Sequence, residues 1–157
     1  MIYVVLAPFL ALVDLIAKYG IENMKEKDLP RYLGPVEIKR VYNRGFFMES
    51  FQNQKKLVKY LPLGITSFLV GVLALLLPQK GKHLQKLSLS LVIAGGLSNL
   101  FERLFKGYVV DYIHVRVKVL EKTVFNLGDG CIFLGGLLYL VSLLGSRKKK
   151  DSLQGRE

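Results

Sequence analysis

Long apolar stretches alternate with short charged ones along this chain, and the pattern predicts four membrane-spanning helices. The apolar stretches lie at residues 2–20, 57–77, 87–105 and 125–144. Each is close to the ~20 residues that a helix needs to cross a hydrocarbon core. No Lys or Arg precedes the first stretch, and no small-residue cleavage motif follows it, so we expect a retained span and not a cleaved signal peptide.

Two of the polar stretches carry a β pattern. Val36, Ile38 and Val41 alternate with polar residues, which predicts a strand over 36–42, and the NRG that follows is typical of a turn. The segment VVDYIHVRVKV, within residues 106–124, also has β character. The fold class predicted from the pattern is nevertheless an all-α membrane protein, a four-transmembrane-helix bundle with short β segments outside the membrane.

Charge and composition agree with a membrane location. The 157 residues are 51% hydrophobic and carry a formal net charge of +11. The basic residues flank the apolar stretches and form no continuous face, so we predict contact with membrane lipid and no nucleic-acid partner. The lone Cys131 lies in an apolar run and is interpreted as a packing residue.

The number of spans and the basic loops predict the topology. Four spans put both termini on one side, and the basic 79–86 loop and the RKKK of the tail favour the cytoplasm. The longer 21–59 segment, with nine Lys and Arg against five acids, gives an opposing signal. We therefore predict one membrane-embedded domain over residues 1–145 and a basic cytoplasmic tail, 146–157, that is disordered.

Ionisable residues inside the spans gather toward one membrane face. Each costs at least ~2.5 kcal/mol near a helix centre, so their placement is informative. Antiparallel threading brings the following span residues to the face opposite the tail, together with Asp111 in the loop after the third span: Asp14, Lys18, Glu102, Arg103 and Asp129. Asp14 and Lys18, and likewise Asn99 and Arg103, are four residues apart and share a helix face. The alternative readings are a neutralising ion pair for the first and interhelical hydrogen bonding for the second.

Asp111 and Asp129 are the candidates for catalysis. They stand 18 residues apart, on either side of a loop that leaves the membrane and returns to it. Two carboxyl groups in contact share a proton, because neighbouring like charges do not both ionise easily. One then acts as general base toward water and the other as general acid. Simple solvation of two acids at the membrane edge is the alternative that spacing alone leaves open.

At these residues the sequence resembles a known family, the lipoprotein signal peptidases (signal peptidase II). GGLSNLFERLFKGYVVDYI is similar to that family's GG-x-x-GN-x-x-DR block with the VVD-[FY]-[IF] that follows it. VFNLGDGCIFLG resembles its FN-x-AD-x-x-I-x-x-G block. DLIAKY and YNRGFF resemble its D-x-x-[ST]-K and N-x-G-x-x-F stretches. The four blocks occur in the family's order and cover most of the chain.

The resemblance implies an intramembrane aspartyl protease with Asp111 and Asp129 as its catalytic pair. The supporting or substrate-binding residues that it implies are Asp14, Lys18, Asn43, Gly45, Asn99, Arg103 and Asn126. It also implies a β-cradle on the outer side of a bacterial cell membrane, and cleavage of diacylglyceryl-modified prolipoproteins just before the lipid-bearing cysteine. Neither a metal nor another cofactor is expected. The expected partners are the prolipoproteins and membrane lipid, with the chain acting as a monomer.

Several positions depart from the family pattern. Ser98 and Gly128 replace a usual Gly and Ala, Glu102 replaces a usual Asp, and Phe46-Phe47 stand where small residues are common. We expect the two rings near the substrate entrance, either narrowing it or packing into the cradle or the lipid interface. Two other functions remain open at this point. One is a weak or narrow-specificity paralogue that binds lipopeptides, and the other is a proton-coupled transporter, which would need polar groups through the whole membrane depth.

Overall fold

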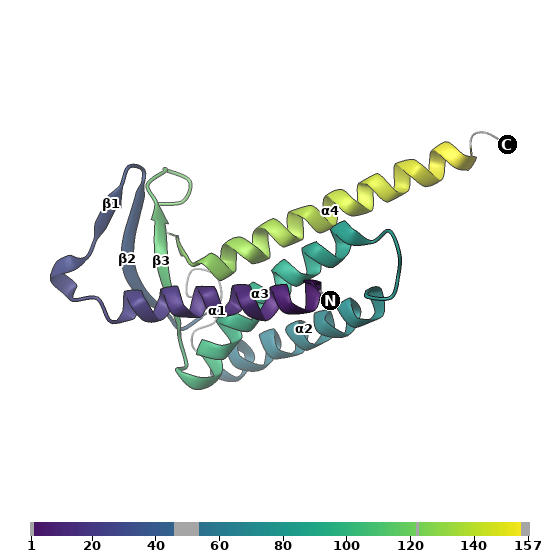
Figure 1. The fold of residues 1–157 in the computed structure, drawn as a ribbon. Helices are drawn as coiled ribbons and strands as arrows, with labels where there is room; N and C mark the ends of the chain where they lie inside the picture. Colours follow the sequence, from purple (N-terminus) through teal and green to yellow (C-terminus); the bar gives the residue numbers. More distant parts are fainter. Residues whose placement is uncertain (1, 46–53, 122, 155–157) are drawn as a thin grey trace.

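The four apolar stretches form four helices in the computed structural model, which describes residues 2–45, 54–121 and 123–154. They are α1 (Ile2–Glu22), α2 (Lys55–Leu76), α3 (His83–Phe105) and α4 (Leu127–Gln154) (Figure 1). All four are long and apolar enough to cross a membrane, as predicted. Most predicted limits agree to within two residues. The larger differences are at the start of α3, which is His83 and not residue 87, and at the end of α4, which is Gln154 and not residue 144.

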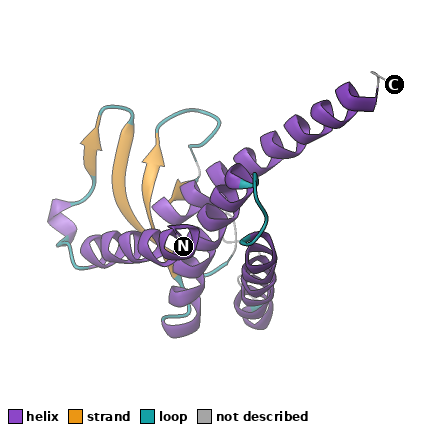
Figure 2. Cartoon of the chain, turned by 45° about the vertical axis from the view of Figure 1, so that its right-hand side comes forward, coloured by secondary structure: helices purple, strands orange, loops and turns teal. Residues whose placement is uncertain are grey.

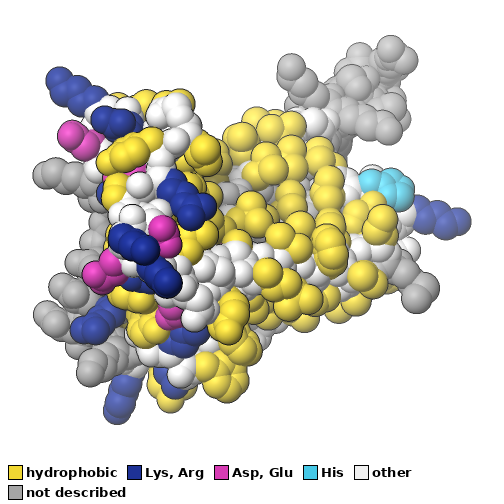
Figure 3. Space-filling model, turned by 60° about the vertical axis from the view of Figure 1, so that its left-hand side comes forward, with side chains coloured by type: hydrophobic (Ala, Val, Ile, Leu, Met, Phe, Trp, Pro, Cys, Tyr) yellow, Lys and Arg dark blue, Asp and Glu magenta, His cyan; other side chains and the backbone are white. Residues whose placement is uncertain are grey.

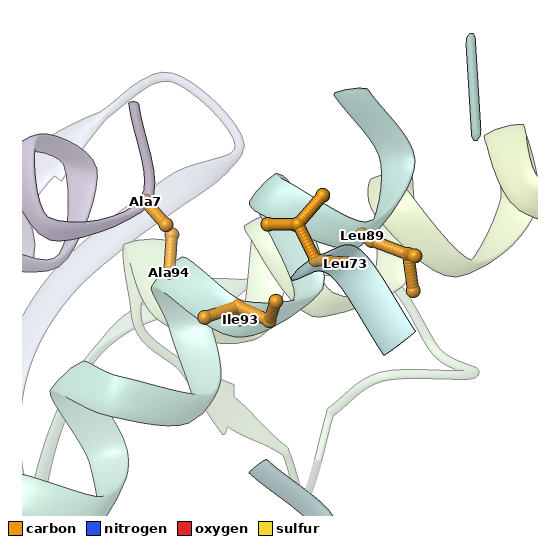
Figure 4. Close-up of a cluster of buried hydrophobic side chains, with 5 residues drawn as sticks. All are labelled: Ala7, Leu73, Leu89, Ile93 and Ala94. Carbon is orange, nitrogen blue, oxygen red and sulfur yellow. The ribbon is translucent and has the colours of Figure 1, made fainter. Parts of the chain in front are cut away.

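Helix α3 lies at the centre of the bundle. It packs against α1, α2 and α4. Of the residues in its apolar stretch, 61% are buried, against 17–28% in the apolar stretches of the other three helices. The apolar core between these helices is a cluster of Ala7, Leu73, Leu89, Ile93 and Ala94 (Figure 4). The outward faces of α1, α2 and α4 are apolar as well and form a broad hydrophobic surface along the helices (Figure 3). An apolar exterior of this kind fits a lipid surrounding.

Two glycines beside the bundle turn the chain where other residues would be strained. Gly107, with a φ of 79°, follows α3, and its N–H and that of Lys106 both bond to the carbonyl oxygen of Glu102. This is the usual end of a helix at a left-handed glycine. Gly34, with a φ of 62°, makes the turn between the first two strands.

A small antiparallel sheet stands at one end of the bundle (Figure 2). Its strands lie in the order β1 (Arg31–Leu33), β2 (Val36–Asn43), β3 (Val109–Val115) and β4 (Val124–Phe125). Both predicted β segments are confirmed as β2 and β3, which pair with a bulge between Ile38 and Val41. The sheet packs on the end of α1 through a second core cluster of Ile21, Val110 and Tyr112.

The two chain ends lie away from the sheet. The N-terminus of α1, the turn between α2 and α3 and the far end of α4 all lie at the opposite end of the bundle (Figure 1). The apolar part of α4 ends at Gly145, but the helix continues to Gln154. The prediction of a disordered tail is therefore wrong for residues 146–154. Arg and Lys are good helix formers, and extending an existing helix needs no new nucleus.

Candidate active site

The i, i+4 pair on α1 is the centre of a buried polar cluster between α1 and α3. Lys18 and Asp14 are almost fully buried, and the ammonium lies 2.9 Å from the Asp14 carboxylate. The Lys18 ammonium also donates to Asn99 at 2.7 Å and to Ser98 at 3.1 Å. The Ser98 hydroxyl in turn donates to Asp14. A buried charge is tolerable only when it is paired and hydrogen-bonded, and this cluster meets both conditions.

Glu102 extends the cluster to the edge of the sheet. Its fully buried carboxylate lies 3.4 Å from the Lys18 ammonium and accepts the N–H of Val110 in β3 at 2.9 Å. Its other oxygen accepts from Lys106, which also bonds to Glu22 at the end of α1. Burial opposes the charge of Lys106, but its hydrogen bonds with Glu22 and Glu102 raise its pKa overall. The cluster thereby joins α1 and α3 to β3, the strand that carries Asp111.

Asp129 lies in the first turn of α4, where a capping box holds it. Asn126 immediately precedes the helix, and its side-chain oxygen accepts the N–H of Asp129 at 2.8 Å. The Asp129 carboxylate reaches back to the N–H of Asn126 at 3.1 Å. Reciprocal bonds of this kind satisfy two N–H groups that a helix start leaves without partners. The N-terminus of α4 also stabilises a negative charge on this carboxylate.

Asp111 lies in β3 and is 4% exposed. Its two carboxylate oxygens accept hydrogen bonds from different amides, one from Asn126 at 2.7 Å and one from Asn43 at 3.0 Å. Asn126 therefore contacts both aspartates: its side-chain nitrogen donates to Asp111, while its side-chain oxygen and its backbone N–H bond to Asp129.

The two carboxyl groups influence each other electrostatically. Burial raises the pKa of Asp111 from its ordinary 3.8 to about 6, and the negative charge of Asp129 adds to the increase. The amides of Asn43 and Asn126 act in the opposite direction, because they bond to the charged form. Near neutral pH the pair therefore passes between one proton and none, which is the condition that a carboxyl dyad needs to work as both acid and base.

The remaining predicted residues surround the pair. Asn99 donates to Asp129 at 2.8 Å while it accepts from Lys18, and so connects the buried cluster to the dyad. Arg103 donates to the carbonyl oxygen of Gly45 at 3.1 Å. The N–H of Gly45 bonds to the side chain of Asn43 at 3.0 Å, which forms the predicted turn after β2. All nine site residues predicted from the sequence therefore lie in one connected region.

Tyr112 belongs to this region and was missed by the sequence analysis. Its hydroxyl donates to Asp14 at 3.2 Å and accepts the N–H of Leu127, the first residue of α4, at 3.2 Å. Burial raises the pKa of Tyr112 above its usual range, and the charge of Asp14 contributes. The phenol therefore stays protonated and ties the start of α4 to the buried cluster. A tyrosine beside an aspartate in a strand pattern carries no sequence signal for this role.

Two further observations complete the site. Among the residues that the structure describes, no group of three or more His, Cys, Asp or Glu side chains is placed to hold a metal ion. Phe46 and Phe47, expected near the substrate entrance, lie outside the described residues.

The fold of this chain resembles that of known proteins along most of the chain. Two solved structures, each described as a bacterial membrane enzyme, match with TM-scores of 0.79 and 0.73 at 23% and 22% identity, covering 94% and 90% of this chain and 90% and 92% of theirs. At that identity the likeness shows the fold.

The sequence relatives identify the family. The lipoprotein signal peptidase of Clostridium acetobutylicum is 29% identical over 143 residues, covering 89% of this chain and 92% of the relative. That of Halothermothrix orenii is 29% identical over 152 residues, covering 96% and 100%. The family model for signal peptidase (SPase) II matches residues 6–145. The chain therefore belongs to the signal peptidase II family, as its motifs indicated.

Proposed function

We propose that this protein is an aspartic endopeptidase that removes signal peptides from lipid-modified prolipoproteins, with Asp111 and Asp129 as its catalytic pair. The observation that carries this proposal is the position of Asn126, which bonds to both carboxyl groups at once. Membership of the family and the names of the relatives support the substrate class. Cleavage just before the lipid-bearing cysteine is the reaction implied by the family.

The geometry supports a general acid–base mechanism. Ionised Asp129, at the start of α4, takes a proton from a water molecule, whose oxygen attacks the scissile carbonyl carbon. Protonated Asp111 gives its proton to the developing oxyanion. In the collapse of the tetrahedral intermediate the C–N bond breaks, Asp129 gives the leaving nitrogen the proton that it took from water, and the hydroxyl formed from the oxyanion returns its proton to Asp111. Asn43, Asn99 and Asn126 hold the two carboxyl groups in place during these transfers.

Two alternative functions are less well supported. A proton-coupled transporter needs polar groups along the membrane path, but residues 91–97 of α3, LVIAGGL, are all apolar or glycine and separate the buried Ser90 from the buried Ser98. A paralogue that only binds lipopeptides would not require two carboxyl groups coupled through one asparagine.

The supporting residues all come from one chain and share one network, so we also propose that residues 1–145 act as a single peptidase domain in a monomer surrounded by lipid.

Complementation tests the proposed function in cells. In a bacterium depleted of its own signal peptidase II, this protein should restore conversion of a lipidated prolipoprotein to its mature form on a gel. The matched control is the same chain with Asp129→Asn. Accumulation of the uncleaved precursor in the presence of stably inserted wild-type protein would contradict the proposal and favour the binding paralogue.

We also propose that both termini face the cytoplasm and that the sheet and the dyad face the outer leaflet. The turn between α2 and α3, with Lys80 and Lys82, lies at the end of the bundle opposite the sheet, as do the N-terminus of α1 and the far end of α4 (Figure 1). Reporter fusions at the tail and near Lys82 should therefore read cytoplasmic, and a fusion near Asn43 should read external. An external tail with a cytoplasmic Asn43 would reverse the topology and move the dyad to the inner leaflet.

The raised pKa of Asp111 predicts how the dyad responds to pH. The free enzyme loses the shared proton as pH rises through about 6, so kcat/KM should fall on the alkaline side of that value. Folding stability should fall with rising pH as well. The folded state binds this proton more tightly than the unfolded state, so protonation of Asp111 stabilises the fold fully below pH 3.8, and this stabilisation is lost as pH rises through about 6. The loss amounts to at most about 3 kcal/mol.

Thermal unfolding in detergent measures this stability term. The wild-type protein should lose stability between about pH 4 and 6, and Asp111→Asn should lack that step because its side chain does not ionise. The same pH dependence in both proteins would show that Asp111 does not carry the raised pKa.

A further inference from the structure

His114 forms a buried contact that the catalytic mechanism above does not use. It lies in β3, three residues after Asp111, and is 7% exposed. Its Nδ1 is 2.6 Å from a carboxylate oxygen of Glu37 in β2, and its Nε2 is 2.8 Å from the carbonyl oxygen of Glu121. His114 and Glu37 are direct partners in the β2–β3 register. One imidazole thus joins β2 to the segment that follows β3.

Both ring nitrogens of His114 face oxygen atoms that accept hydrogen bonds. A backbone carbonyl has no proton to donate, and neither has an ionised carboxylate. The hydrogen bond with His114 lowers the pKa of Glu37, and the charges of Lys39 and Arg116 lower it further, so Glu37 is ionised near neutral pH. A neutral imidazole has one N–H and satisfies one of the two contacts. Only the doubly protonated ring donates to both.

The segment that His114 holds leads directly to the dyad. After β3, the Arg116 N–H bonds to the carbonyl oxygen of Pro35, and Thr123 is buried. Val124 then pairs with His114 itself, and Phe125 pairs with Ile113, to form β4. Asn126, the residue that contacts both aspartates, follows immediately. Residues 123–126, which lead from the sheet back to α4, are called the returning segment. The position of Asn126 therefore depends on how firmly the returning segment is fixed to the sheet.

We propose that His114 is a positioning residue whose doubly protonated ring fixes the returning segment, and through it Asn126, against β2 and β3. This inference rests on the proposed function, because Asn126 matters for catalysis only if the dyad does. Side chains alternate between the faces of a strand, so His114 and Asp111 point to opposite faces, and the effect travels through the backbone. When the ring loses one proton, the charge-assisted contact with Glu37 persists and the contact with Glu121 is lost.

Amide hydrogen exchange of the purified protein in detergent tests the contact without any substrate. After correction for intrinsic rates, protection of residues 123–126 in the wild type should fall about five-fold between pH 5.5 and 8.5, which corresponds to about 1 kcal/mol. His114→Gln has one donor group, the NH2, and one acceptor group, the carbonyl oxygen, so like a neutral imidazole it presents a donor at only one of its two polar ends and should show low protection at both pH values. The matched control is His83→Gln, since His83 is the only other histidine, and it contacts Tyr3 at the far end of the bundle.

Glu37→Gln gives an independent readout. The amide introduced by this substitution can donate to Nδ1, so a neutral ring keeps its one N–H for the carbonyl oxygen of Glu121, and the fall in protection should disappear. Protection that does not change with pH in the wild type would overturn the proposal. A fall in protection that persists unchanged in His114→Gln or in Glu37→Gln would overturn it as well.

Peptidase kinetics separate positioning from a purely structural role. The ratio of wild-type to His114→Gln kcat/KM should be about five at pH 5.5 and about one at pH 8.5, because the wild type loses the same contact there. A constant ratio across pH would overturn the positioning role. Failure of the proposed function would give a different result. The wild-type protein would then be inactive as a peptidase, while its amide exchange would still depend on pH because the His114 contact is intact.

Discussion

Asp111→Asn and Asp129→Asn should each abolish peptide cleavage while the protein still folds and inserts. Near neutral pH an amide neither takes a proton from water nor gives one to the substrate, so the variants lose general acid–base catalysis. One acid–base group typically accelerates a reaction by about 10²–10⁴-fold. We expect a loss of at least about 10³-fold in kcat/KM for either variant. The measurement is turnover of a lipidated precursor by purified protein, with thermal unfolding as the check on folding.

A matched variant makes this result specific to the dyad. Glu26→Gln removes an acidic group from the exposed 3₁₀ turn Glu26–Asp28, where the side chain contributes only a weak 3.8 Å ion pair with Arg40. It should retain wild-type turnover. Near-wild-type activity in either aspartate variant would show that the pair is not the catalytic centre.

Gly95→Ala should also cause a large loss, for a purely steric reason. A Cβ at Gly95 would lie 2.0 Å from the carbonyl oxygen of Gly128 and 2.8 Å from the side chain of Ile132. Helices α3 and α4 must therefore separate, and the bond between Asn99, one turn further along α3, and Asp129 must lengthen. Displacement by about 1 Å is enough to cost 10²-fold in rate, and overpacking costs about 1–3 kcal/mol of stability.

Gly136→Ala is the control for this prediction. Gly136 also lies in α4, but a Cβ there would meet nothing within 4 Å. Gly136→Ala should leave activity unchanged and the unfolding temperature unchanged or slightly higher, because Ala favours a helix over Gly, whereas Gly95→Ala should reduce both. Equal behaviour of the two variants would show that the close approach of α3 and α4 does not set the geometry of the dyad.

The spans and the two main strands could be predicted because their signals are local. Helical apolar runs and strand alternation are read from neighbouring residues, and the i, i+4 spacing of Asp14 and Lys18 placed both on one helix face. The start of α3 was placed too late because Lys86 was read as a loop residue. The structure buries it instead, with its ammonium bonded to the carbonyl oxygens of Leu77 and Gln79 beyond the end of α2. A lysine that caps a neighbouring helix has the same sequence signal as one in solvent.

The candidate site was predictable in its members but not in its connections. The motifs indicated Asn126 and Asp129, and their i, i+3 spacing at a helix start is compatible with a capping box. That the same asparagine also bonds to Asp111 depends on where β3 lies relative to α4, which no local pattern specifies. The same reason applies to Tyr112 and His114, whose partners Asp14 and Glu37 are 98 and 77 residues away in the chain.

The central claim is that this chain cleaves lipid-modified precursors at one defined bond with a two-aspartate centre. Mass spectrometry of the products from purified protein and a lipidated prolipoprotein tests it most directly. We expect one cut, immediately before the lipid-bearing cysteine, and no product from the Asp111→Asn/Asp129→Asn double variant. A cut at another bond, or the same product from the double variant, would contradict it.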